Sequence, residues 1–426
     1  MGRPRPYDPR MPDRRRRPLV FVLLAVLIGG LALIAAGVWI GARHPGVLPA
    51  PIERALAGPP SDRVIDEAID DVESTYYRRI PRSLLRSDAI AGIVARLNDR
   101  FSNYFSPAEY RRFKEQQGST FTGVGITVSS DPRGLKVEKV FDGSPAKRAG
   151  ILAGDVITAS NGRPLKGLST DRASALIKGP AGTDVRLTFE RDGRSRTATL
   201  VRSPISVPVV ASALREACGK KVGVVALSQF SSGAHAEVYR ALRRLKARGA
   251  QAFVLDLRDN GGGLVDEAQL VASAFLRDGK IVTTRGRNVP TRTLNATGQP
   301  VVPDAPLVVL VDRGTASASE IVAGALQDRG RAKLVGTRTF GKGVFQEVIE
   351  LSNGGALDIT AGQYFTPKGR NLGGRGVVQG RDVARGVGLK PDITVAATPG
   401  AKTDTQLRAA LDAVAGCAAG ARSPAG

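Results

Sequence analysis

Residues 306–324 read PLVVLVDRGTASASEIVAG, and this stretch decides the class of fold. Pro306 to Val311 form a continuous apolar run, which is typical of a strand buried on both faces of a sheet. From Ser317 to about Arg329 the apolar residues recur at helical spacing, so we expect a helix just beyond this strand. A buried strand that leads into a helix is typical of α/β proteins, in which loops at strand ends are natural catalytic positions.

The sequence on either side shows the same alternation. VGVVAL, AFVLDL and AKLVG are further continuous apolar strands, and helical patterns fall between them at residues 236–249 and 264–279. We therefore predict an α/β core over residues 206–400, followed by a C-terminal helix and tail over residues 401–426.

Residues 119–205 follow a different pattern. GVGITV, LKVEKV, DVITAS, DVRLTFE and TATLVR are short strand-like runs separated by Gly, Asn and Asp turns, which predicts a compact β-rich domain. Ahead of it, residues 61–118 contain two runs with helical spacing and predict a small helical module. The alternative is that these helices merely pack under the β-rich domain.

The N-terminal residues predict a membrane anchor. Residues 1–18 hold seven arginines against two aspartates, and residues 19–42 contain no charge. Twenty-four apolar residues suffice to cross a bilayer as a helix, whereas the apolar region of a cleaved signal peptide, the alternative, is usually shorter. The arginines then stay cytoplasmic, and the chain beyond the linker at residues 43–60 lies outside the cytoplasm, in the cell envelope.

The formal net charge of +23 raises the question of nucleic acid binding. No basic motif with interleaved aromatic residues is present, so we exclude that class and expect contact with anionic envelope surfaces instead. The chain has two cysteines, Cys218 and Cys417, both in the predicted exported part. An oxidising compartment permits a disulfide between them, but the sequence leaves open whether they pair.

Three hydroxyls, those of Thr315, Ser317 and Ser319, lie at the start of the predicted helix. Helix starts favour serine as an N-cap regardless of function, so capping is the alternative to a nucleophilic role. A serine nucleophile needs a neighbouring base. The chain holds only two histidines, and neither suits this role: His44 adjoins the apolar segment, and His235 has the pattern of an exposed first helical turn.

Two glycine-rich loops supply other parts of a site. LDLRDNGGG, residues 255–263, can turn consecutive N–H groups toward one point, as an oxyanion hole or a phosphate cradle requires. GTRTFGKGVFQ, residues 336–346, carries Lys342 between glycines. It is not a P-loop, because Gly343 cannot coordinate magnesium and a strand-like run follows. Lysine can act as a general base where burial lowers its pKa enough to leave the amine neutral.

Two resemblances connect these parts. Gly123, Val124, Gly125 and Ile126, together with SPAKRAGILAGDVITASNG, resemble a PDZ domain, whose glycine-rich loop binds a peptide's terminal carboxylate. TASASEIVAGALQDRGRAKLVGTRTFGKGVFQ, residues 315–346, resembles the catalytic segment of the carboxyl-terminal processing peptidases. That family implies an anchor or signal, a PDZ domain and a crotonase-like α/β core, and the similarity covers about residues 60–400.

The second resemblance implies a role for each matching position. Ser317 is the nucleophile, Lys342 the base, and Gln346 orients the lysine, while Asp328 is structural. The oxyanion donors implied are the N–H groups of Ala318 and of a glycine in the loop, most closely Gly262. This chain departs from the family in having Thr315 where serine is common and in inserting VVQGRDVARG at residues 377–386.

Together these features predict a membrane-anchored, extracytoplasmic serine endopeptidase of the Ser–Lys type. It would act on proteins or peptides with accessible C-termini and would need no metal or other cofactor. The PDZ domain would bind the substrate's tail, gate the catalytic site, or do both. The alternative is a catalytically inactive PDZ adaptor of the envelope. The resemblance also implies a homodimer or higher oligomer built through the helical module. The sequence leaves open the substrate and whether the PDZ domain activates or inhibits.

Overall fold

The computed structural model describes residues 2, 29–30, 64–118, 120–373, 388–398, 400 and 403–417. Apart from Gly2, Gly29 and Gly30, the basic tail and the predicted membrane segment lie outside these residues, as do the linker and the inserted residues 377–386. Among the helices that the structure describes, none has both the length and the apolar character needed to cross a bilayer. The anchor therefore stays a prediction.

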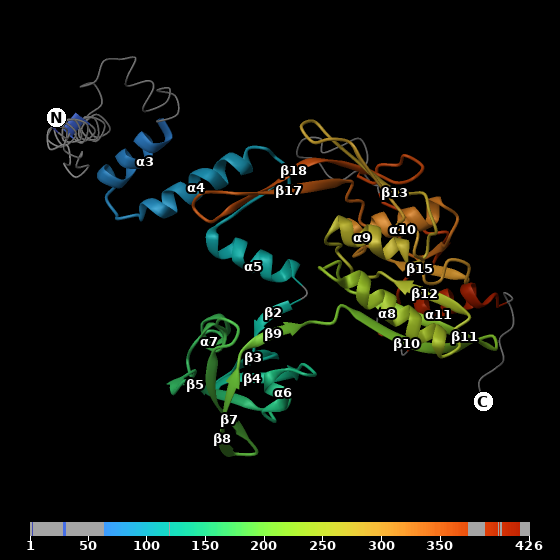
Figure 1. Ribbon diagram of the computed structural model, residues 1–426, viewed down its shortest axis with the longest axis horizontal. Coiled ribbons are helices and arrows are strands. Elements are labelled where there is room, and N and C mark those ends of the chain that lie inside the picture. Colours follow the sequence, from blue (N-terminus) through green and yellow to red (C-terminus); the bar gives the residue numbers. More distant parts are fainter. Residues whose placement is uncertain are drawn as a thin grey trace. The chain divides into compact units, whose positions relative to one another are not determined.

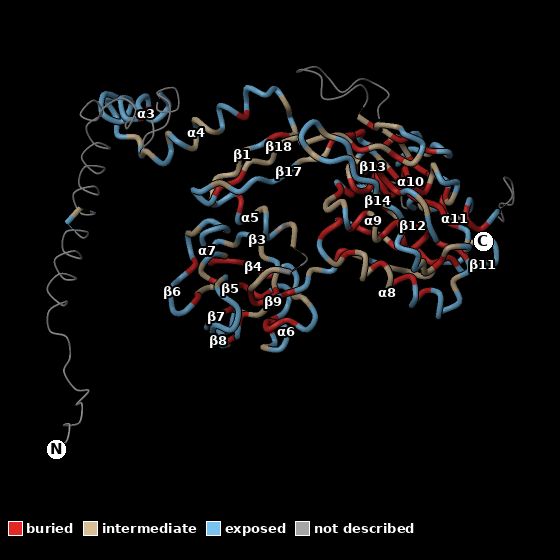
Figure 2. The backbone as a smooth tube through the Cα atoms, turned by 45° about the horizontal axis from the view of Figure 1, so that its top comes forward, coloured by how far each residue is buried: buried red, intermediate tan, exposed pale blue. Residues whose placement is uncertain are grey.

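The chain divides into two compact units, Met1–Ile90 and Ala91–Gly426. The first unit contains helix α3 (Val64–Thr75) and the beginning of helix α4 (Arg82–Ala95). Arg82 and Arg86 of α4 form ion pairs with Asp66 of α3. Of the apolar residues whose spacing predicted α3, only Ile69 is buried outright, and Figure 2 shows α3 as largely exposed.

The second unit contains the predicted β-rich domain. Its five-strand path runs β3-β4-β5-β7-β8 with β6 beside β5, and β2 pairs separately with β9. Leu135, Ile157 and Leu187 are among the side chains that form its core. The elements are β2 (Thr120–Gly123), β3 (Ile126–Asp131), β4 (Gly134–Val140), α6 (Pro145–Arg148), β5 (Val156–Ser160), β6 (Arg163–Pro164), α7 (Thr170–Ile177), β7 (Asp184–Arg191), β8 (Arg194–Val201) and β9 (Ser203–Ser206).

The predicted α/β core is built on a six-stranded sheet of order β10-β11-β12-β15-β16-β19. Figure 1 labels β10, β11, β12 and β15 of this sheet. The edge strand β10 is antiparallel to β11, and the other pairs are parallel. The predicted continuous apolar strands are confirmed. The elements are β10 (Val210–Ala217), β11 (Lys220–Leu227), α8 (Ala234–Ala247), β12 (Ala252–Asp256), α9 (Val265–Ser273), β15 (Leu307–Val311), α10 (Ala318–Asp328), β16 (Lys333–Gly336), β19 (Ile393–Thr394) and α11 (Thr405–Ala415).

Helices cover both faces of this sheet. Alternate residues of β12 point to opposite faces: Phe253 and Leu255 pack in the cluster that contains α8, α9 and α10, whereas Val254 packs in the cluster that contains α11. A disulfide between Cys218 and Cys417 joins the turn between β10 and β11 to the residue beyond α11. The pairing that the sequence left open is thus formed in the structure.

A second, antiparallel sheet adjoins the core. Its strand order is β1-β18-β13-β14, with β17 also pairing with β18. The strands are β1 (Asn103–Phe105), β13 (Lys280–Gly286), β14 (Arg292–Asn295), β17 (Val344–Glu350) and β18 (Ala356–Phe365). Helix α5 (Pro107–Gln117) follows β1 and begins at a capping box formed by Ser106 and Glu109. This sheet combines β1, from the beginning of the second unit's sequence, with strands from the later part of that sequence. It contributes residues to the candidate site.

Candidate active site

The three hydroxyls at the start of α10 have different environments. Thr315 is fully buried, and its hydroxyl donates to the Leu257 carbonyl at 2.8 Å. Ser319 is also fully buried and donates to the Asn260 carbonyl at 2.8 Å. Ser317 is partly exposed. Of the three, Ser317 is therefore the hydroxyl that a substrate can reach.

Ser317 is the N-cap of α10 and has an unusual backbone conformation, with φ 55° and ψ −117°. A positive φ costs a residue with a side chain about 1–3 kcal/mol, so surrounding contacts must hold it. Strain of this kind is common where a turn presents a reactive side chain, and it sets Ser317 at the positive end of the helix dipole. The structure thus agrees with a nucleophile at this position without testing the role.

The glycine-rich loop lies directly against the Ser317 turn. A Cβ placed on Gly262 would lie 2.8 Å from the Ala316 carbonyl oxygen and 2.9 Å from the Ala318 nitrogen, so only glycine fits. Asn260 ties the two segments together, because its carbonyl accepts from the Ala316 N–H at 3.0 Å. The loop and the helix start are therefore one packed unit.

The predicted oxyanion donors lie side by side but differ in availability. The N–H of Gly262 donates to the Asn260 side-chain oxygen at 2.9 Å, so in this arrangement it does not point freely into the site. To serve as a donor, it must be released by Asn260. The Ala318 N–H lies at the first position of α10, where helix N–H groups have no partner within the helix. Both assignments stay predictions.

Lys342 lies in the loop between β16 and β17, in a partly buried niche. Its ammonium donates to Gln346 Oε1 at 2.7 Å and lies over the Phe101 ring, 5.2 Å from its centre. Gln346 in turn donates to the Thr360 hydroxyl at 3.2 Å. Burial lowers the pKa of Lys342, while the carboxylates of Asp358, Asp99 and Glu320 oppose that shift. Here Nζ makes no hydrogen bond to Ser317.

Glu320 joins the two predicted catalytic segments. Its Oε2 accepts from the backbone N–H of Ser317 at 3.0 Å and from that of Lys342 at 2.9 Å. Its Oε1 accepts from the Thr339 hydroxyl at 2.5 Å and from the Gly341 N–H at 2.8 Å. The side chain is fully buried, and burial raises its pKa against the effect of these four donors. Our sequence reasoning missed this residue, although it belongs to the quoted TASASE run.

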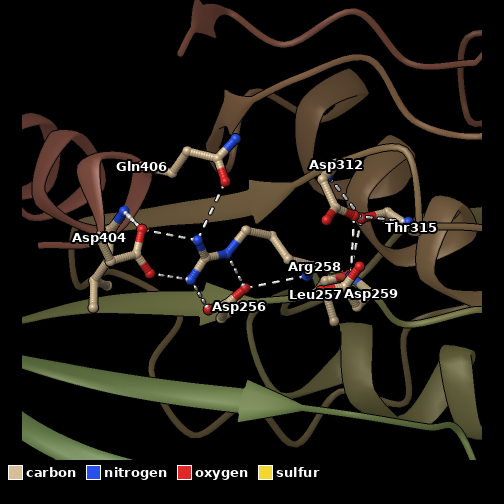
Figure 3. A network of polar contacts seen from close by, with 9 residues as sticks. Asp256, Leu257, Arg258, Asp259, Asp312, Thr315, Asp404 and Gln406 are labelled. Atoms are coloured by element: carbon tan, nitrogen blue, oxygen red, sulfur yellow. Dashed lines mark hydrogen bonds and ion pairs between the residues drawn. The ribbon is translucent and has the colours of Figure 1, made fainter. Parts of the chain in front are cut away.

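A second polar network holds the glycine-rich loop to the C-terminal helix (Figure 3). The Arg258 guanidinium contacts Asp256 at the end of β12 and Asp404, the N-cap of α11, both at 2.7 Å. On the other side of the loop, Asp312 accepts from the N–H groups of Asp259 at 3.0 Å and Gly314 at 2.9 Å. Arg258 and Asp259, at the start of the glycine-rich loop, are thus held by Asp404 at the start of α11 and by Asp312 after β15.

Asp328 and His235 have partners other than Ser317 and Lys342. Asp328, at the end of α10, accepts from the Thr366 hydroxyl at 2.5 Å and the Lys368 N–H at 2.9 Å and pairs with Arg370, as a structural carboxylate would. His235 lies in the first turn of α8, where its Nδ1 is 2.8 Å from Glu267 Oε2. Within the described ranges, no three His, Cys, Asp or Glu side chains are grouped to hold a metal ion.

The predicted carboxylate-binding loop of the β-rich domain lines a groove. The strand β3 is at the edge of its sheet, and helix α7 packs beside it. The residues that line the groove are Phe121, Gly123, Val124, Gly125, Ile126, Val128, Ser174, Ile177 and Lys178. An open strand edge beside a helix is the arrangement by which an extended peptide is added to a sheet.

Comparisons with known proteins agree with this architecture. Residues 221–395 match peptidase family S41, and residues 136–191 match a PDZ domain. The chain is 38% identical over 335 residues to a carboxyl-terminal-processing protease of Picosynechococcus sp., covering 76% of this chain and 78% of that protein. A protease of the same name from Synechocystis sp. is 38% identical over 333 residues, covering 77% and 76%.

A solved structure, the photosystem II D1 C-terminal processing protease, is 30% identical, with a TM-score of 0.46 and coverage of 79% of this chain and 94% of that one. The family resemblance drawn from residues 315–346 is confirmed by the sequence relatives. On that ground, this chain belongs to peptidase family S41 and is a PDZ-containing protease of the carboxyl-terminal-processing type.

Proposed function

We propose that this protease is an extracytoplasmic serine endopeptidase, anchored in the membrane through residues 19–42, that uses a Ser317–Lys342 dyad. The observation that carries the dyad is Glu320, because one of its oxygens lies within 3.0 Å of the backbone nitrogens of both residues. Sharing that acceptor keeps the two segments adjacent. The proposed reaction requires the lysine amine to leave Gln346 and reach Ser317.

In the proposed reaction, Ser317 Oγ attacks the scissile carbonyl carbon while neutral Lys342 takes the hydroxyl proton. The N–H groups at the start of α10 and in the glycine-rich loop stabilise the negative charge on the carbonyl oxygen. The resulting ammonium gives its proton to the leaving amine, and an acyl-enzyme remains. Lys342 then takes a proton from water as the water oxygen attacks the acyl carbon, and it returns that proton to Ser317 Oγ when the ester bond breaks.

Three single substitutions test the dyad. Ser317→Ala and Lys342→Ala should each abolish cleavage of an unfolded protein such as casein, because one removes the nucleophile and the other its base. Ser319→Ala is the matched control, since that hydroxyl is buried against the Asn260 carbonyl, and it should keep most of the activity. Normal turnover by Ser317→Ala would refute the assignment.

The alternative of an inactive adaptor is tested by labelling the purified protein with a serine-reactive fluorophosphonate. Modification of Ser317 in the wild type, and its loss in Ser317→Ala, supports the peptidase. A protein that binds tails but shows neither labelling nor cleavage supports the adaptor.

Three features support the proposed location and partner. The apolar segment at residues 19–42 supports an anchor, and the Cys218–Cys417 disulfide is typical of an oxidising compartment. The groove between β3 and α7 supports binding of an extended C-terminal tail. In intact spheroplasts, externally added protease should digest the catalytic domain and leave a protected N-terminal fragment; full protection of the catalytic domain would contradict the proposed topology.

A further inference from the structure

A chain of hydrogen bonds connects Lys342 to the segment that precedes β1. Lys342 donates to Gln346 at 2.7 Å, and Gln346 donates to the Thr360 hydroxyl at 3.2 Å. The backbone N–H of Thr360 donates to Ser102 Oγ at 3.0 Å, and that hydroxyl donates to Asp99 Oδ2 at 2.6 Å. A segment more than 200 residues earlier in the chain is therefore part of the lysine's surroundings.

Asp358 brings a second carboxylate to the same place. It lies two residues before Thr360 on β18, so the two side chains share one face of the sheet. The strand register sets Asp358 between Asn103 of β1 and Val348 of β17. Its half-buried carboxylate accepts no hydrogen bond from the part of the chain that the structure describes. An ionised group in that position is costly unless a cation lies nearby.

Lys342 is the cation that meets this need. Burial raises the pKa of Asp358, and the charge of Lys342 opposes this, while Asp99 reinforces the increase. The pKa of Asp99 is lowered by its hydrogen bonds and by Lys342, against the effect of burial. Glu320 of α10 also acts on the amine, and the Arg100 guanidinium lies over the same Phe101 ring that the amine contacts, 4.6 Å from its centre.

We propose that Asp99 and Asp358 are positioning residues for the peptidase reaction, which hold the Lys342 amine in its protonated form against Gln346 in the free enzyme. The inference rests on the proposed role of Lys342 as the base. An ammonium cannot take the Ser317 proton, so the two carboxylates raise the pH below which the free enzyme is inactive, against the effect of burial.

The test is the pH dependence of kcat/KM on a quenched fluorescent, unstructured peptide, measured with the full-length protein. Asp358→Asn removes the negative charge with little change in shape and breaks no hydrogen bond within the described residues. It should move the acid limb of the profile to lower pH by about one unit, because the ammonium loses a stabilising charge. Asp99→Asn should move it in the same direction. Glu347→Gln, an exposed carboxylate on β17, is the matched control and should not move it.

A second readout does not depend on activity. Lysine labelled with carbon-13 at Cε reports the titration of Lys342, assigned by the signal that Lys342→Arg removes, and Asp358→Asn should lower its midpoint. If a folded Asp358→Asn protein leaves both the limb and the midpoint unchanged, or raises them, the inference is wrong while the dyad stands. If Lys342→Ala keeps wild-type turnover, it is the dyad itself that fails.

Discussion

Ser317, Thr315 and Ser319 carry similar chemistry, and their surroundings separate them. The carbonyls of Leu257 and Asn260 engage two of the hydroxyls in the buried interior, which leaves the partly exposed Ser317 for substrate. The same logic applies to Lys342, whose amine is held by an amide oxygen, an aromatic ring and nearby carboxylates. At the scale of single residues, the hydrogen-bond partner that each polar side chain already has determines its possible role in the site.

Glu320 is the residue whose loss should disturb both members of the proposed dyad. In Glu320→Gln one carboxylate oxygen becomes an NH2 group, which cannot accept from either of the two donors that faced it. Leaving buried donors unpaired costs about 1–3 kcal/mol each, so we expect lower stability and a kcat at least about tenfold lower, with KM little changed. Urea unfolding and steady-state kinetics measure the two effects.

The control for this variant is Glu267→Gln. Glu267 is also a buried carboxylate, but it accepts from the N–H groups of Gly233 and His235 at the start of α8. It should lose stability without a comparable loss of kcat. Equal losses of kcat in both variants would show that Glu320 acts only through general stability.

At the scale of elements, the site is the junction of a strand–helix turn, a glycine-rich loop and the edge of a second sheet. Ser317 lies between β15 and α10, and the loop after β12 packs against it. Residues of β17 and β18 lie around Lys342. The turn is rigid because backbone groups of the loop and of the helix start bond to each other. Substitutions in the glycine-rich loop should therefore change the position of Ser317.

Gly262 and Gly261 are adjacent and give opposite expectations. Gly262 has φ +103° and its Cβ would collide with the backbone of Ala316 and Ala318, whereas a Cβ on Gly261 meets nothing within 4 Å. Gly262→Ala should displace the Ser317 turn and lower kcat by about 100-fold, the loss typical of damage to an oxyanion hole. Gly261→Ala should keep nearly normal turnover in the same peptide assay; equal kcat for the two variants would contradict the packing argument.

The elements that the sequence predicted correctly are those that depend on local sequence patterns. The apolar run at residues 306–311 and the helix after Ser317 appear as β15 and α10, and the run after Lys342 is a strand, as the exclusion of a P-loop required. Asp99 and Asp358 could not be found in this way, because their proximity to Lys342 depends on strand pairing: that of β1 with β18 for Asp99, and that of β17 with β18 for Asp358. The engagement of Gly262 by Asn260 depends on a side-chain rotamer, which spacing does not specify.

At the scale of the whole molecule, helix α11 packs on the sheet of the peptidase core and is bonded to the core at several points. Ala410 and Val414 of this helix pack on the sheet, Asp404 pairs with Arg258, and Cys417 is bonded to Cys218. The Lys220 ammonium also donates to the Ala415 carbonyl at 2.8 Å. Helix α11 is therefore joined to the glycine-rich loop through Arg258, and to the start of β11 through Cys218 and Lys220.

The disulfide should account for a large part of the stability of the catalytic domain. It links residues 199 apart, and the chain-entropy estimate for a loop of that length is about 5 kcal/mol at 25 °C. Cys218→Ser should therefore unfold at markedly lower urea concentration than the wild type under oxidising conditions. Under reducing conditions the two should coincide, and a persistent difference would mean that the substitution acts through packing rather than through the bond.

The same bond affects how self-digestion would look on a gel. Because Cys218 and Cys417 are covalently joined, a single cut anywhere between them leaves both pieces attached. Such a nicked molecule migrates near the position of the uncut chain until a thiol is added, and only then separates into two bands. A single autolytic cut between these two cysteines is therefore seen on a reducing gel and missed on a non-reducing one.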